Sequence, residues 1–469
     1  MKHFILKVAW QPVIPLIALM FALITCENDS KKEVAHNPNQ PIVLTSFEPD
    51  SGRIRDMVLL NGENFGTDLS AIKVLFNASE AKVVGSTGTR ILVRVPRLPG
   101  DTCILTVKIG NQEKAYTQEF RYKVAASVTT IAGNGEETDT GAGKEVIWEN
   151  GLDNSRMTPV YMGIDNEDNL FVSVRPGYLF YINTKENTIR LIATEAQHGY
   201  MQRCPPYINP RNNVIQTGGE GAANRDRFLF LDPKTGWAPS IKYIKSWDWH
   251  KLQPPAANDE STHPHCILNE DDGYYYTRYR SGLIAKVCPE TWHAEAIGMT
   301  PAGQALGLAF NPINKNELWI GYWGSGTSMN NGLCTVDVSD TTKFWSPDET
   351  AQIGLMRNFQ RRSSIVSSAG HRDGPIHLAQ FNQMRQINFD SQGNLFIGDS
   401  GNDCIRMVNT KVNPMMVETI IGIPGQRNFK DGNRDEALFN QPQGLVVDSN
   451  DIIYVSDWGN NRLRRVAVE

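Results

Sequence analysis

The sequence LFIGDSGNDCIRMV at residues 395–408 returns as IYVSDWGNNRLRRV at residues 453–466, 58 residues later. The match continues upstream without a gap, because RDGPIHLAQFNQ at 372–383 aligns with KDGNRDEALFNQ at 430–441. A long internal repeat is typical of folds built from similar units that pack on one another. This pair of repeats therefore decides how the rest of the chain is interpreted.

Weaker copies of the same pattern occur upstream and bring the number of units to six. They lie at residues 164–174, 208–218, 268–278 and 310–323. Each unit alternates short apolar strands with polar turns, and one unit alone cannot bury its apolar faces. Four short strands per unit, arranged radially, predict a six-bladed β-propeller over residues 127–469.

The last unit has room for three strands only. The sequence VTTIAG at 128–133 is similar to VETIIG at 417–422, which occupies an outer-strand position in the preceding unit. We therefore expect residues 128–133 to pair with the strand at 462–466 and to close the ring. TIAGNG at 130–135 and the sequence at 439–466 resemble NHL repeats, which implies an NHL-type propeller.

Residues 42–124 alternate strand-like runs with turn signals at short intervals. The motifs PDSG at 49–52, LNGENFG at 60–66, VLFN at 74–77 and VRVP at 93–96 resemble the IPT/TIG family. That resemblance implies an immunoglobulin-like sandwich. The expected fold is all-β: an IPT/TIG sandwich followed by the propeller.

The first 25 residues have the features of a signal peptide. Lys2 and Lys7 are basic, and residues 13–24 form an apolar run too short to span a bilayer. The run ends in LITC, which resembles a lipobox with Cys26 as the lipidated residue; an ordinary cleaved signal is the alternative. CENDSKKE at 26–33 resembles a surface-export signal of bacterial lipoproteins, and residues 26–41 are expected to be a tether. Together these features imply a lipid-anchored protein on the outer surface of the outer membrane.

The net charge limits the expected binding partners, and the cysteine spacing indicates whether disulfides are expected. The formal net charge is −5, which does not favour nucleic acid, and the lipid anchor is the only expected membrane contact. The remaining cysteines are widely spaced and contain no CxxC motif, which favours free thiols over a disulfide framework: Cys103, Cys204, Cys266, Cys288, Cys334 and Cys404.

The residues that enter the first strand of each unit line one mouth of a propeller. They are Tyr161, Arg203 with Cys204, His263 with His265, Leu306, Arg385 with Gln386, and Gln443. No carboxylate occurs in this set, although a catalytic cation in a propeller needs several converging ligands. There is also no GxSxG motif. We therefore predict no catalytic residue, no metal site and no cofactor.

Tryptophan is absent from the expected sandwich, and several copies fall in loops of the expected ligand face. An exposed indole can stack on the apolar face of a sugar, while polar neighbours bind its hydroxyl groups. Packing between blades is the alternative role for any one of them. The predicted ligand-binding residues are Trp247, Trp249, Trp323, Trp458, Arg175, Arg278, Tyr279 and His265.

The whole chain resembles surface lipoproteins with IPT/TIG and NHL domains that are associated with polysaccharide uptake. This resemblance implies that the protein captures an oligosaccharide or polysaccharide for an outer-membrane transporter and its associated surface lipoproteins. Two alternatives stay open: a propeller enzyme, either a lyase or a lactonase-like hydrolase, and a protein-docking module.

The lipobox resemblance yields a direct test. The variant Cys26→Ala has no acylation site, so it should leave the membrane fraction, because the acyl chains supply the anchor. Fractionation followed by immunoblotting measures this. Unchanged membrane association of the variant would contradict the prediction.

Overall fold

The structure is a computed structural model. It describes residues 34–98, 102–137, 157–194, 205–211, 213–217, 226–249, 262–324, 329, 331–339, 359–363 and 369–468, and only the backbone of 216–217 and 262–265. Cys26, Arg203 and Cys204 lie outside these residues. The described part contains no helix with the length and apolar character that a bilayer crossing requires.

The N-terminal domain is a β-sandwich in which β5 pairs with β4 at one end and with β6 at the other. Alternate residues of its strands point inward, as the period of two in an extended chain requires, and Phe47, Phe76, Tyr116 and Phe120 meet edge to face or tilted in the core. Its strands are β1 (Val43–Glu48), β2 (Ser51–Gly52), β3 (Met57–Gly66), β4 (Ile72–Phe76), β5 (Ser79–Ser86), β6 (Gly88–Arg94), β7 (Thr102–Ile109) and β8 (Gln112–Tyr122).

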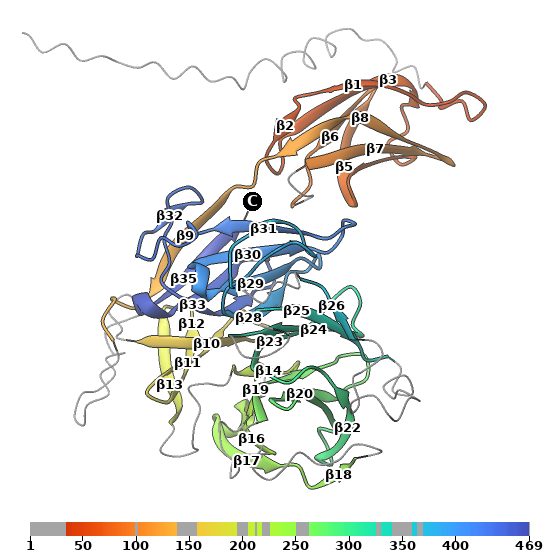
Figure 1. Cartoon of the computed structure of the whole chain (residues 1–469). Helices are drawn as coiled ribbons and strands as arrows, with labels where there is room; N and C mark the ends of the chain where they lie inside the picture. Colours follow the sequence, from red (N-terminus) through yellow and green to blue (C-terminus); the bar gives the residue numbers. More distant parts are fainter. Residues whose placement is uncertain are drawn as a thin grey trace, which may run out of the picture.

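Six sheets follow, one per predicted unit and antiparallel except for the β18–β22 pair, and they confirm the six-bladed propeller (Figure 1). Each blade places its first strand innermost. Blade 1 contains β10 (Thr158–Ile164), β11 (Leu170–Arg175), β12 (Tyr178–Asn183) and β13 (Thr188–Thr194). Blade 2 contains β14 (Tyr207–Ile208), β15 (Val214–Thr217), β16 (Arg227–Asp232), the 3-10 helix η3 (Pro233–Thr235) and β17 (Ala238–Tyr243). Blade 3 contains β19 (Thr262–Leu268), β20 (Tyr275–Tyr279), β21 (Leu283–Val287), β22 (His293–Met299) and, outside β22, β18 (Ser246–Asp248).

The last three blades have the same order. Blade 4 contains β23 (Ala305–Phe310), β24 (Glu317–Tyr322), β25 (Leu333–Asp337) and β26 (Phe359–Arg361). Blade 5 contains β28 (Met384–Phe389), β29 (Leu395–Asp399), η5 (Ser400–Asn402), β30 (Cys404–Asn409), β31 (Met416–Ile421) and β27 (Gly374–Pro375). Blade 6 contains β33 (Pro442–Val447), β34 (Ile453–Asp457), η6 (Trp458–Asn460), β35 (Arg462–Val468), β9 (Ala126–Ala132) and β32 (Gly432–Asn433).

Blade 6 joins the two ends of the propeller sequence. β9 pairs antiparallel with β35, with Val128 opposite Val466 and Ala132 opposite Leu463. The expected closure is therefore confirmed, and Figure 1 shows the orange β9 inside the blue sheet of the C-terminal strands. Val128 is buried, so the closing strand also contributes to the core of the blade.

A buried arginine holds each of the two clear repeats together. In blade 6 the Arg464 guanidinium donates to the carboxylates of Asp457 and Asp431 and to the backbone oxygens of Lys430 and Leu438. Arg406 makes the equivalent contacts in blade 5 with Asp399 and Asp373. Burial raises the pKa of Asp399 and of Asp457 to about 6, and the paired arginine opposes the rise. The recurrence of these residues thus reflects blade architecture.

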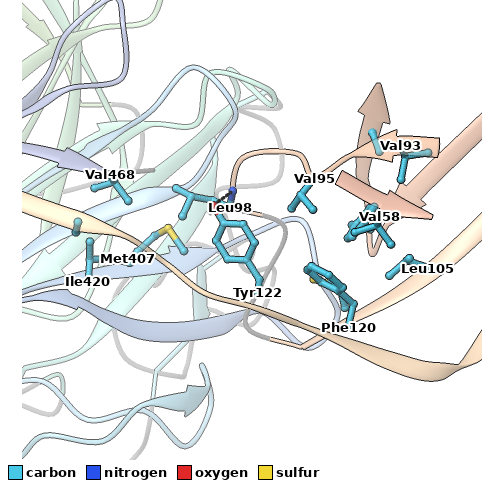
Figure 2. Close-up of a cluster of buried hydrophobic side chains, with 14 of the residues drawn as sticks. Val58, Val93, Val95, Leu98, Leu105, Phe120, Tyr122, Met407, Ile420 and Val468 are labelled. Atoms are coloured by element: carbon cyan, nitrogen blue, oxygen red, sulfur yellow. Dashed lines mark hydrogen bonds between the residues drawn. The ribbon is translucent and has the colours of Figure 1, made fainter. Parts of the chain in front are cut away.

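The sandwich is packed against blades 5 and 6. Figure 2 shows Leu98 and Tyr122 of the sandwich facing Met407, Ile420 and Val468 of the propeller, and these residues belong to one continuous core.

Arg97 adds a polar link at the same junction. Its guanidinium donates to the Asp451 carboxylate at 2.8 Å and to the backbone oxygens of Asp451 and Val468.

The described cysteines are not joined in disulfides: Cys103, Cys266, Cys288, Cys334 and Cys404. Burial raises the pKa of the Cys334 thiol to about 12 and that of Cys404 well above its ordinary value. These thiols are therefore packing groups.

Closure by β9 can be tested by truncation. A chain that begins at Ser127 keeps β9, and a chain that begins at Glu136 lacks it; neither contains the sandwich. The shorter chain should melt at a lower temperature and aggregate, because β35 becomes an exposed, unpaired edge. Calorimetry and light scattering measure both effects. Equal melting and equal solubility would show that closure does not depend on β9.

The buried arginine network predicts a large loss from Arg464→Met. The variant leaves Asp457 buried without its cation and two backbone oxygens without their donor, at a cost of roughly 3–5 kcal/mol of unfolding free energy. Arg465→Met is the matched control, since Arg465 is the next residue of β35 and is partly exposed. Urea unfolding of both variants measures the difference. Similar losses in the two variants would contradict the assignment.

Candidate functional site

One face of the propeller carries the strand-entry residues and the loops that follow the second strand of each blade. At its centre Val160 and Tyr161 of β10 contact Leu306 of β23, so blades 1 and 4 meet across the ring. Trp323, which follows β24, and Trp458, which follows β34, pack on the same three residues. We call these five residues the mouth cluster.

Two arginines lie over the indole rings of the mouth cluster. The Arg175 guanidinium carbon is 5.1 Å from the centroid of Trp458, and that of Arg385 is 4.6 Å from the centroid of Trp323. Arg385 also donates to the Tyr161 hydroxyl at 3.3 Å. The cluster thus combines aromatic surface with cationic groups from blades 1 and 5.

Several buried polar atoms of this region have no hydrogen-bond partner among the described residues. They are Nε1 of Trp323, Nε1 of Trp458 and Nε of Arg385, all buried. A buried indole N–H normally finds an acceptor, and leaving one unpaired is costly. Three such atoms around one mouth show that the described residues leave several of its donors unsatisfied.

Beneath the mouth cluster, Gln386 ties three blades together. Its amide oxygen accepts from the backbone N–H of Met162 and of Leu445, and its amide nitrogen donates to the Met162 oxygen. Beyond Gln386 the channel contains a cavity of about 240 Å³ lined by the inner strands of all six blades. The mouth cluster therefore rests on a hydrogen-bonded floor.

The predicted site residues divide into two groups in the structure. Trp323, Trp458 and Arg175 come together at the mouth: Trp323 follows β24, Trp458 begins η6 after β34, and Arg175 is the last residue of β11. Trp247 and Trp249 do not lie in a loop of that face. Residues Ser246–Asp248 form β18, which pairs with β22 at the outer edge of blade 3, and the two indoles stack on each other at 4.3 Å.

Arg278 and Tyr279 also differ from their expected loop positions, because both are buried in β20. Arg278 donates to the Thr300 hydroxyl and to the backbone oxygens of Pro301 and Gly303, so its guanidinium stabilises blade 3. The Tyr279 hydroxyl donates to Asp226. The backbone of His265 belongs to β19, and its side chain lies outside the described residues.

Tyr161 and Arg385 are functional candidates that were not among the predicted ligand-binding residues. Both belong to the strand-entry positions, so the repeat alignment places them at the mouth. The alignment does not show that Arg385 would lie over Trp323, because this contact joins blades 4 and 5. Considering the strand-entry residues together with the loop tryptophans would have identified both.

The described residues contain no group of three His, Cys, Asp or Glu side chains arranged to hold a metal ion. The buried carboxylates near this face, Asp399 and Asp457, each bind an arginine and an asparagine of their own blade. The chemistry that the mouth offers is therefore stacking and hydrogen-bond donation.

Sequence comparisons identify both parts of the chain. Residues 41–122 match the IPT/TIG domain family, and residues 439–465 match the NHL repeat family. A curated relative, NHL repeat-containing protein 2 of Gallus gallus, is 36% identical over 85 residues. The aligned region spans 11% of the length of that relative.

Solved structures share the complete architecture. An auxiliary nutrient binding protein from Bacteroides thetaiotaomicron is 20% identical, with a TM-score of 0.55 and coverage of 93% of this chain and 99% of its own. Another, from Bacteroides ovatus, is 18% identical, with a TM-score of 0.55 and coverage of 93% and 100%. The chain thus consists of an IPT/TIG domain, residues 41–122, joined to a six-bladed β-propeller that contains an NHL repeat at residues 439–465.

Proposed function

We propose that the protein is a binding protein that captures a glycan at the mouth cluster. The observation that carries this proposal is the convergence of Trp323 and Trp458, from blades 4 and 6, on one mouth with their ring N–H groups unpartnered. A sugar matches both the indole rings and their N–H groups, since its ring has an apolar face that can stack and its hydroxyl groups accept hydrogen bonds.

The expected contribution of each indole follows from its chemistry. An aromatic platform contributes about 1–3 kcal/mol per stacked nucleic-acid base. A sugar has no π system, so the lower end of that range applies, which corresponds to roughly tenfold in affinity per tryptophan. The rigid floor at Gln386 limits the entropy that ordering the site would cost on binding.

Two further parts of the proposal concern location and partners. Lipidation at Cys26 would hold the protein on the outer surface of the outer membrane, and the captured glycan would pass to an outer-membrane transporter and its associated surface lipoproteins. The similarly folded Bacteroides structures are described as auxiliary nutrient binding proteins, which agrees with a capture role.

A glycan array on the soluble chain from residue 34, followed by calorimetry on the best ligand, tests capture. Trp323→Ala and Trp458→Ala should each weaken binding about tenfold. Trp458→Phe keeps an aromatic ring and removes the N–H donor, so it should cause a smaller loss of affinity than Trp458→Ala. Tyr243→Ala on the outer strand of blade 2 is the control, because Tyr243 is an exposed aromatic away from the mouth.

The same calorimetry tests whether Trp247 and Trp249, at the edge of blade 3, take part in binding. If the mouth is the site, the double variant Trp247→Ala, Trp249→Ala leaves affinity unchanged. A folded double variant that no longer binds would place the site on blade 3, and no bound glycan on the array would contradict capture altogether.

A further inference from the structure

We propose that the glycan captured at the mouth carries an acidic group, a carboxylate or a sulfate, that is bound by Arg175 and Arg385. This inference rests on the proposed function and adds the chemical class of the ligand. Two independent features of the mouth support it: the kind of polar atoms left unpartnered and the charge of the residues that surround them.

The unpartnered atoms at the mouth are all donors. Nε1 of Trp323, Nε1 of Trp458 and Nε of Arg385 each carry a hydrogen, and none of them can accept a hydrogen bond. A neutral sugar hydroxyl can accept from such donors, but it brings no negative charge to the two guanidinium groups. A carboxylate or sulfate only accepts, and its bonds to charged donors are the stronger kind.

The two arginines also lack an ion-pair partner among the described residues. Neither Arg175 nor Arg385 forms an ion pair with a described residue, although the whole chain has a net charge of −5. Three other arginines that lie over aromatic rings form ion pairs: Arg362 with Glu317, Arg406 with Asp399, and Arg464 with Asp457.

Two other arginines of the propeller donate to backbone oxygens in place of a carboxylate. Arg278 donates to the oxygens of Pro301 and Gly303, and Arg462 to those of Gly133 and Asn134. Arg385 has only the Tyr161 hydroxyl as a described partner. Its guanidinium, with a fork of donors that matches a carboxylate, is therefore available to a ligand.

Both cations border the same opening. Arg175 lies over Trp458 and Arg385 over Trp323, and the two indoles pack on the one group of Val160, Tyr161 and Leu306. A ligand that rests on these indoles meets positive charge from blade 1 and from blade 5. The shared opening makes one acidic sugar residue a suitable occupant.

The test uses the soluble chain from residue 34 and an array that contains uronate-bearing, sulfated and neutral glycans. The best acidic ligand is compared by calorimetry with its carboxyl-reduced or desulfated counterpart of equal length. The neutral counterpart should bind at least tenfold more weakly, and affinity for the acidic form should fall as salt rises.

Substitution of Arg385 tests whether its positive charge binds the acidic group. Arg385→Gln should weaken the acidic ligand about tenfold or more, a larger loss than it causes for the neutral counterpart, whereas Arg385→Lys should restore part of the loss. Arg190→Gln is the matched control, because Arg190 is an exposed arginine over Tyr181 in blade 1, away from the mouth.

The outcomes separate the two proposals. Neutral glycans that bind as tightly as acidic ones, with a loss in Trp323→Ala and none in Arg385→Gln, would overturn the acidic ligand and keep glycan capture. Absence of any bound glycan on the array would overturn both. Acidic binding that survives both Arg175→Gln and Arg385→Gln would also overturn this inference.

Discussion

The pairing of β9 with β35 is the interaction on which the rest of the propeller depends. A ring of blades has no natural end, so the first and last strands of its sequence must meet in one sheet or leave two exposed edges. Here the antiparallel register places Val128 opposite Val466, and the same strand leads directly out of the sandwich. Closure, domain junction and the core of blade 6 are therefore one continuous piece of structure.

The mouth cluster follows from that closure, because its members come from blades that are distant in sequence. Tyr161 of blade 1 contacts Leu306 of blade 4, and Gln386 of blade 5 bonds Met162 of blade 1. Such contacts form only when all six inner strands surround one axis. The fold thus brings segments of four blades to one mouth, where aromatic rings and guanidinium groups lie together.

The repeat in the last two blades allowed the architecture and its closure to be predicted, since spacing and strand pattern follow from local chemistry. The site was only partly predictable. Trp247 and Trp249 stand in a polar stretch that resembles a loop, yet tertiary pairing makes Ser246–Asp248 an edge strand. Arg278 matches a loop position by alignment, but it is buried and donates to the backbone oxygens of Pro301 and Gly303. Arg385 became a candidate only through Trp323, a contact between blades that no single repeat encodes.

The position of β9 also has a consequence for biosynthesis. During translation this strand emerges about 330 residues before its partner β35. The sandwich has mostly local pairings and can fold early, whereas β9 must wait as an open edge while five blades are made. A nascent chain in this state is exposed to edge-to-edge association with other chains. A chaperone that covers β9 until β35 arrives would therefore protect the chain at its most exposed stage of folding.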